Sequence, residues 1–296
     1  MLFQAFVLAV LTVGTIILVK KLRQFRVRIR RLLGRSKNYY SLCSSPDCVR
    51  CNRNATSLQS AREVFKDCFA DDPELFVIEN SLEIQIKKTD PKHVLTIDGL
   101  TPGFALARIS RDTFLLEQSW KAVLEEYRII RKSAEGWSFN CASGGSQTWR
   151  VFNLMNQGRW VTENLNRCPQ TKELLQQLSQ LMTGCAFGYV FFSVLPPNTC
   201  ISEHCGATNA RIRCHLALQV PDGDVELSMK VAEETVGWTA GQCLIFDDSK
   251  PHSVRYTTKS NYVTSAKDRV VLLLDFWHSD LTLKERACLS RLFPAV

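Results

Sequence analysis

The residue types best suited to metal chemistry gather in one short stretch of the chain. Three of the five histidines, His204, His215 and His252, lie within it, and two arginines, Arg213 and Arg269, accompany them. Imidazole nitrogens bind divalent transition metals, and guanidinium groups grip carboxylates through paired hydrogen bonds. The stretch therefore predicts a metal held by histidines, beside a site for a small dicarboxylate.

The segment 211–220 alternates as a β-strand does. Arg211, Arg213 and His215 fall on one face, and apolar residues fall on the other. A strand at the surface, with its arginines and histidine in water, would show the same pattern. The other histidines and Arg269 nearby favour a polar inner face that binds a ligand, because buried charges need partners.

The metal set departs from the usual facial triad of two histidines and a carboxylate. That triad is written His-x-Asp/Glu with a distant second histidine, but here His204 is followed by Cys205 and Gly206. A protein carboxylate is therefore missing from the expected position. Two imidazoles also suit a structural zinc, so the identity of the metal stays open on these residues alone.

Short β-strands dominate the second half of the chain, and turn residues separate them. Many short strands without intervening helices are typical of a sandwich or barrel of jelly-roll type. Ahead of them, apolar residues at helical spacing predict a helix over 112–131 that Asp112 caps, and a second helix is expected over 171–182. The expected strands cover 149–154, 189–195, 211–220, 225–231, 243–246 and 270–277.

The first 60 residues differ in composition from the rest. Residues 1–19 are almost continuously apolar, which predicts a transmembrane anchor. We expect a basic, cysteine-containing juxtamembrane linker over 20–60. A domain over 61–296 follows it, with a β-core at about 188–281. The net charge of +8 comes from the basic block at 20–37. The remainder is close to neutral, so no nucleic-acid partner is expected.

The sequence signals for membrane orientation conflict. The basic flank favours a cytosolic domain by the positive-inside rule. The 12 cysteines favour an oxidising lumen, and Asn54-Ala55-Thr56 is an acceptor sequon for glycosylation.

Several motifs in order carry a specific resemblance. They are Ser193-Val194-Leu195, His204-x-Gly206-x-Thr208-Asn209-x-Arg211-x-Arg213-x-His215-Leu216, Trp238-x-x-Gly241, Phe246-Asp247-Asp248-Ser249-x-x-His252, Arg269 and Asp275-x-Trp277-His278. With these, roughly residues 90–290 resemble the aspartyl/asparaginyl β-hydroxylases, and most closely their membrane-anchored members.

The resemblance implies a mainly β fold with flanking helices, built around a double-stranded β-helix. It implies Fe(II) on His204 and His252, with 2-oxoglutarate held by Ser193, Arg213, His215 and Arg269. The family also has glycine at the position of Gly206. The implied reaction consumes 2-oxoglutarate and O2, and the implied substrate is a protein side chain, such as the β-carbon of Asp or Asn. The family and the cysteine count favour a domain in the lumen of the endoplasmic reticulum.

Two functions remain in view. The first is a membrane-anchored Fe(II)/2-oxoglutarate dioxygenase that hydroxylates protein side chains. The alternative is an inactive binding or scaffold protein that retains the hydroxylase fold, which the absence of a 34-residue repeat for receiving substrate favours. Cys205 and Cys214, near the site in sequence, favour it too, because a thiol beside ferrous iron is unusual.

Overall fold

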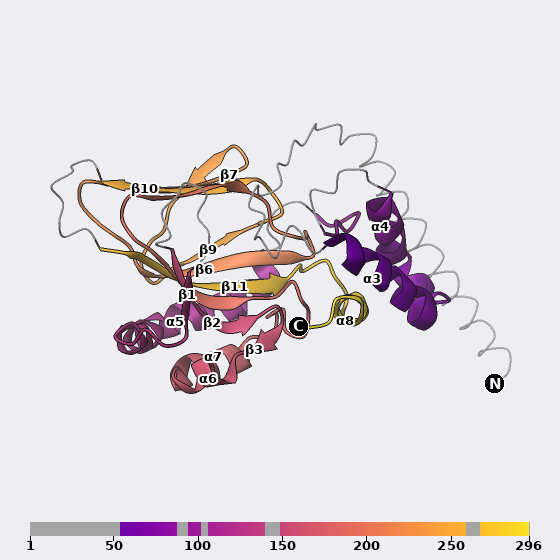
Figure 1. Cartoon of the computed structure of the whole chain (residues 1–296), viewed down its shortest axis with the longest axis horizontal. Coiled ribbons are helices and arrows are strands. Elements are labelled where there is room, and N and C mark those ends of the chain that lie inside the picture. Colours follow the sequence, from indigo (N-terminus) through magenta and orange to yellow (C-terminus); the bar gives the residue numbers. More distant parts are fainter. Residues whose placement is uncertain (1–53, 88–93, 102–105, 140–148, 259–266, 296) are drawn as a thin grey trace. The chain divides into compact units, whose positions relative to one another are not determined.

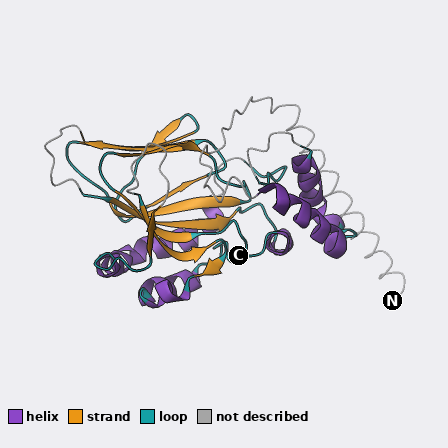
Figure 2. Ribbon diagram, viewed as in Figure 1, coloured by secondary structure: helices purple, strands orange, loops and turns teal. Residues whose placement is uncertain are grey.

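Two antiparallel β-sheets face each other in the computed structural model and form the core of the described part of the chain (Figures 1 and 2). The structure describes residues 54–87, 94–101, 106–139, 149–258 and 267–295. The smaller sheet runs β5 (Thr199–His204), β10 (His252–Thr258), β7 (Val225–Val231), β8 (Glu234–Val236). The larger sheet runs β1 (Trp137–Phe139), β2 (Arg150–Asn156), β4 (Val190–Leu195), β11 (Arg269–Trp277), β6 (Arg211–Gln219), β9 (Cys243–Phe246), with β3 (Arg159–Trp160) paired to β2.

The chain crosses repeatedly between the two sheets. From β4 onward, the strands alternate between the larger and the smaller sheet, except that β7 and β8 are neighbours in the smaller one. Strands far apart in sequence therefore pair, such as β11 with both β4 and β6. This alternation draws side chains from seven strands to one space between the sheets.

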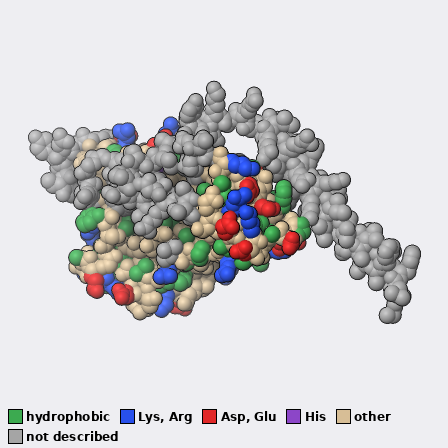
Figure 3. Space-filling view, turned by 45° about the vertical axis from the view of Figure 1, so that its right-hand side comes forward, with side chains coloured by type: hydrophobic (Ala, Val, Ile, Leu, Met, Phe, Trp, Pro, Cys, Tyr) green, Lys and Arg blue, Asp and Glu red, His purple; other side chains and the backbone are tan. Residues whose placement is uncertain are grey.

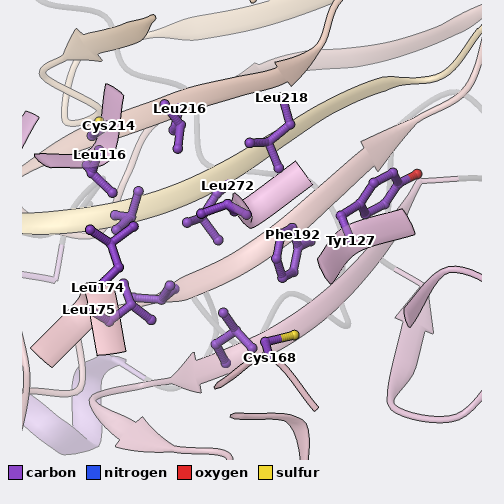
Figure 4. Close-up of a cluster of buried hydrophobic side chains, with 14 of the residues drawn as sticks. Leu116, Tyr127, Cys168, Leu174, Leu175, Phe192, Cys214, Leu216, Leu218 and Leu272 are labelled. Carbon is purple, nitrogen blue, oxygen red and sulfur yellow. The ribbon is translucent and has the colours of Figure 1, made fainter. Parts of the chain in front are cut away.

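Two helices cover the outer face of the larger sheet, and they explain the apolar alternation of β6. α5 (Leu106–Ile130) and α7 (Pro169–Gln177) contribute Leu116, Tyr127, Leu174 and Leu175 to a buried cluster. The short helix α6 (Thr162–Asn166) precedes α7 in the chain. Figure 4 shows these side chains beside the outward-facing residues of three strands, Cys214, Leu216, Leu218, Phe192 and Leu272. Burial of this face leaves the opposite face of β6 directed at the other sheet.

A second set of helices packs at one end of the sandwich. It comprises α3 (Asn54–Phe69), the 3-10 turn η1 (Pro73–Leu75), α4 (Phe76–Ile86) and α8 (Leu283–Leu292). Their apolar side chains form a buried cluster with Trp277 at the end of β11. On the surface, Lys284 bridges Asp72 at 2.6 Å and Glu74 at 2.8 Å, and Figure 3 shows acidic and basic side chains interspersed over the described part of one face.

The prediction of a mainly β fold with flanking helices is confirmed. The predicted strands are all present with shifts of one or two residues at their ends, and β1, β3, β5, β8 and β10 are additional strands. Both predicted helices are present, but α5 begins six residues earlier than predicted and α7 ends five residues earlier. The predicted helix cap is wrong, because α5 begins at Leu106 and Asp112 lies inside it. The Asp112 carboxylate instead accepts hydrogen bonds from the Gln180 backbone N–H at 2.7 Å and the Ser179 hydroxyl at 3.2 Å.

The predicted anchor at 1–19 and most of the predicted linker at 20–60 lie outside the described residues. Within the described ranges, no helix has both the length and the apolar character needed to cross a membrane. All described residues belong to one compact unit that spans 40–296.

Candidate active site between the two sheets

The cavity between the sheets brings together every residue that the sequence nominated for metal or cosubstrate binding. Its polar lining comprises Ser193 on β4, His204 on β5, Arg213 and His215 on β6, His252 on β10 and Arg269 on β11. Apolar side chains complete the wall, among them Trp149, Phe191, Met229, Val254 and Leu273. The interpretation of β6 as a surface strand is wrong, since Arg211, Arg213 and His215 are all buried.

The two predicted metal ligands face each other across a strand pair. The antiparallel register of β5 and β10 pairs His204 with His252, and an irregularity follows between His252 and Val254. The ring centroids are 4.2 Å apart, with an angle of 53° between the ring planes. Within the described part of the chain, no group of three or more His, Cys, Asp or Glu side chains is arranged to hold a metal.

Backbone carbonyls orient both imidazoles. His204 Nδ1 lies 2.8 Å from the Ser202 carbonyl oxygen, and His252 Nδ1 lies 2.9 Å from the Lys250 carbonyl oxygen. A carbonyl only accepts, so each Nδ1 carries the proton and each Nε2 has a lone pair. Burial, with a further contribution from His204, lowers the pKa of His252 to about 3 and keeps it neutral. Imidazoles whose Nε2 atoms are oriented in this way are suited, in their neutral form, to a divalent transition metal.

Three further polar groups make the cavity a cluster of hydrogen-bond donors. Arg269 is buried, and its Nε and Nη1 have no hydrogen-bond partner among the described residues. The Ser193 hydroxyl accepts a hydrogen bond from Trp149 Nε1 at 2.9 Å, which leaves its own proton for donation. His215 Nδ1 lies 3.2 Å from Trp238 Nε1, and His215 Nε2 likewise has no partner among the described residues. Such a cluster is suited to a carboxylate.

The buried position of Arg269 is costly for its charge. Burial lowers the pKa of Arg269 to about 9, because the charged form is poorly solvated inside the protein. Burial, followed by the charges of Arg269 and Arg213, also holds the pKa of His215 well below its usual range. A bound anion would offset the cost of burying the charge of Arg269. Arg269, Ser193 and His215 together therefore fit a dicarboxylate.

Arg213 and Arg211 belong to a network of four buried charges. Arg211 donates to the Asp248 carboxylate at 3.1 and 2.6 Å, and Arg213 donates to the Asp275 carboxylate at 2.8 and 3.0 Å. Arg213 Nη1 also lies 3.0 Å from Asp248 Oδ2. Burial alone would raise the pKa of Asp248, but the two guanidiniums lower it well below its usual range. Arg213 thus lines the cavity with its fork on Asp275, and its predicted contact with a dicarboxylate stays a prediction.

Asp248 also explains the glycine at the position of the missing triad carboxylate. A Cβ atom at Gly206 would lie 2.3 Å from Asp248 Oδ2, and the Gly206 N–H donates to the Asp248 carbonyl oxygen at 2.6 Å. The Asp248 carboxylate therefore occupies the space that a side chain at 206 would need.

One cavity residue, Trp149, escaped the sequence analysis, and one cysteine was misplaced. Trp149 lines the cavity, yet it precedes an ordinary apolar strand, and nothing in the sequence separates it from a core tryptophan. Cys214 lies on the outer face of β6, in the cluster under α5, so it is not beside the site as expected. His278 is bound outside the cavity, with Nε2 3.2 Å from the Thr101 carbonyl oxygen.

Comparisons with known proteins agree with the site motifs. The profile of the family described as "Aspartyl/Asparaginyl beta-hydroxylase" matches residues 117–279. The human "Aspartate beta-hydroxylase domain-containing protein 2" is 32% identical over 275 residues, which cover 87% of this chain and 72% of that protein. The rat protein of the same name is 37% identical over 201 residues, covering 65% of this chain and about half, 55%, of that protein.

A solved structure is also similar. It is the crystal structure of a Pseudomonas putida prolyl-4-hydroxylase, which is 19% identical in sequence. The aligned region covers 58% of this chain and 97% of that protein's chain, with a TM-score of 0.33.

The contact between Gly206 and Asp248 generates a stability prediction. Gly206→Ala should lower the free energy of unfolding by about 1–3 kcal/mol, because the added methyl group must displace a buried carboxylate held by two guanidiniums. Gly237→Ala is the matched control, since nothing lies within 4 Å of a Cβ atom there. Equilibrium urea unfolding measures both variants. Equal stabilities of the two variants would contradict the steric explanation.

Proposed function

Because the chain belongs to the aspartyl/asparaginyl β-hydroxylase family, we propose that it is an Fe(II)- and 2-oxoglutarate-dependent dioxygenase that hydroxylates protein side chains. The observation that carries the proposal is the pairing of His204 with His252 beside the unpartnered buried donors of Arg269 and His215. One half of the cavity is suited to a divalent metal, and the other half is suited to an anion. The strand order of the two sheets also fits a double-stranded β-helix.

His204 and His252 would hold the iron through their Nε2 atoms. Iron with 2-oxoglutarate and O2 supplies oxidative decarboxylation and the transfer of a hydroxyl group. The Nδ1 hydrogen bonds to the Ser202 and Lys250 carbonyls keep both imidazoles in the Nδ1–H tautomer, which leaves Nε2 for the metal. Two protein ligands in place of three would leave room for the cosubstrate, O2 and water to bind the metal.

The cosubstrate would be held mainly by charge and by hydrogen-bond donors. Arg269, the Ser193 hydroxyl and His215 Nε2 would receive a carboxylate of 2-oxoglutarate. Arg213 would contribute positive charge at the cavity wall while its fork stays on Asp275. The apolar side chains between these groups exclude water, which strengthens each of these interactions.

The family name implies Asp or Asn side chains of a protein as the substrate class, and we adopt it here as part of the proposal. We also propose that residues 1–19 anchor the chain in the membrane of the endoplasmic reticulum, with the domain in the lumen. The apolar run and the sequon at Asn54 support this placement.

The metal proposal is tested with histidine variants. Protein reconstituted with Fe(II) under anaerobic conditions should bind about one iron per chain, and once O2 is admitted it should convert 2-oxoglutarate to succinate and CO2. His252→Ala should lose both properties, because it removes one of the two ligands. His278→Gln, which changes a histidine bound outside the cavity, should retain both. Metal analysis and succinate measurement by mass spectrometry report the result. Iron and 2-oxoglutarate binding without succinate, even with Asp- and Asn-containing peptides, would instead favour the binding protein that the sequence left as an alternative.

The cosubstrate site is tested with Arg269→Lys. An ammonium group cannot reproduce the fork of a guanidinium, so the dissociation constant for 2-oxoglutarate should rise about 10- to 100-fold. Arg255→Lys is the matched control, because Arg255 is on the same sandwich with its side chain 62% exposed. Calorimetric titration with Mn(II) in place of iron measures the affinity. An unchanged affinity in Arg269→Lys would remove Arg269 from the proposed site.

Lumenal placement is tested by protease protection. A tag appended to the C-terminus should survive protease treatment of sealed microsomes and be digested once detergent is added. Digestion without detergent would place the domain on the cytosolic side.

A further inference from the structure

One indole, that of Trp238, contacts two of the three donor groups that form the anion site. Trp238 lies in the connection between β8 and β9 and is buried. Its Nε1 lies 3.2 Å from His215 Nδ1, and its ring is nearly parallel to the imidazole, at 13° with 6.1 Å between centroids. The guanidinium carbon of Arg269 lies 5.1 Å from the centre of the same ring system.

The contact with His215 decides which imidazole nitrogen carries the proton. A neutral imidazole can carry its proton on either nitrogen, and the ring can also turn over. An indole N–H only donates, so His215 Nδ1 must accept and His215 Nε2 must carry the hydrogen. Nε2 is the buried atom without a partner among the described residues. The opposite tautomer would present a lone pair to an incoming carboxylate and repel it.

The contact with Arg269 fixes a charge that has no carboxylate beside it. The described carboxylates of Asp248 and Asp275 are bound by Arg211 and Arg213. The face of an indole attracts a cation without neutralising it. Trp238 can therefore hold the Arg269 guanidinium in place, while the Nε and Nη1 donors of Arg269 stay available for a ligand.

From these two contacts we infer that Trp238 is a positioning residue for the cosubstrate. It fixes the Nε2–H tautomer of His215 and supports the Arg269 guanidinium, so that the cavity presents the donors that a carboxylate requires before any ligand binds. The inference rests on the proposed function for the identity of the ligand, 2-oxoglutarate. The tautomer itself is a property of the protein without any ligand.

Two substitutions separate the two contacts. Trp238→Phe retains an aromatic face under Arg269 but removes the N–H, whereas Trp238→Leu removes both. Trp137→Phe is the matched control, because it deletes an indole hydrogen bond to the Ile130 carbonyl at 3.3 Å on the outer face of the larger sheet.

The first measurement is made on the ligand-free, full-length protein with 15N-labelled histidine. Nuclear magnetic resonance should show one tautomer of His215, with the proton on Nε2, in the wild type and in Trp137→Phe. The assignment comes from the signal that His215→Gln removes. In Trp238→Phe this single tautomer should be replaced by a mixture.

The second measurement is 2-oxoglutarate affinity by calorimetry with Mn(II) bound. Trp238→Phe should weaken binding about three- to fivefold, because only a fraction of the imidazoles then presents the required donor. Trp238→Leu should weaken it about tenfold or more, because Arg269 also loses its support. Mn(II) affinity and the melting temperature should stay close to those of Trp137→Phe.

Two results would overturn the inference. One is a single Nε2–H tautomer and unchanged 2-oxoglutarate affinity in Trp238→Phe. The other is a parallel loss of Mn(II) binding and thermal stability, which would reduce Trp238 to a packing residue. A wild-type protein that binds no 2-oxoglutarate would refute the proposed function. An Nδ1–H tautomer of His215 in that same ligand-free protein would refute the inference.

Discussion

An imbalance of buried charge governs the space between the two sheets. Arg211, Arg213 and Arg269 are buried there, and the described structure sets the carboxylates of Asp248 and Asp275 against the first two. Burying a charge without a partner is expensive, yet Arg269 is placed where its donors line a cavity. The fold tolerates the cost of a buried charge at Arg269, and an anionic ligand would offset that cost. The network beside it sets two guanidiniums against two carboxylates, so its formal charges balance.

The sheets make this arrangement possible because β6 and β11 separate two environments. Their outward side chains are packed under α5 and α7, so the opposite faces can carry charge without weakening the attachment of the helices. The antiparallel register then determines which groups meet. His204 and His252 are 48 positions apart in the chain, but the pairing of β5 with β10 sets them directly opposite each other.

The sequence predicted the apolar strands well and the polar ones poorly. β4, β6 and β11 show continuous or strictly alternating apolar residues, and their positions followed from that pattern. β5 and β10 carry the two metal-ligand candidates but have mixed exposure, so their sequences resemble loops. The site residues were found through their chemistry and the resemblance, independently of these strands. The partners of Arg211 and Arg213 could not be predicted, because strand register, and not spacing in sequence, brings Asp248 and Asp275 to them.

The close approach of Gly206 to Asp248 limits which substitutions position 206 can accept. A third metal ligand cannot be introduced there by exchanging that residue alone, because the new side chain would collide with a carboxylate that Arg211 binds. Shortening Asp248 first would leave Arg211 with an unbalanced charge in the interior. A carboxylate ligand at position 206 therefore requires two coordinated exchanges, and the two-histidine arrangement resists change one mutation at a time.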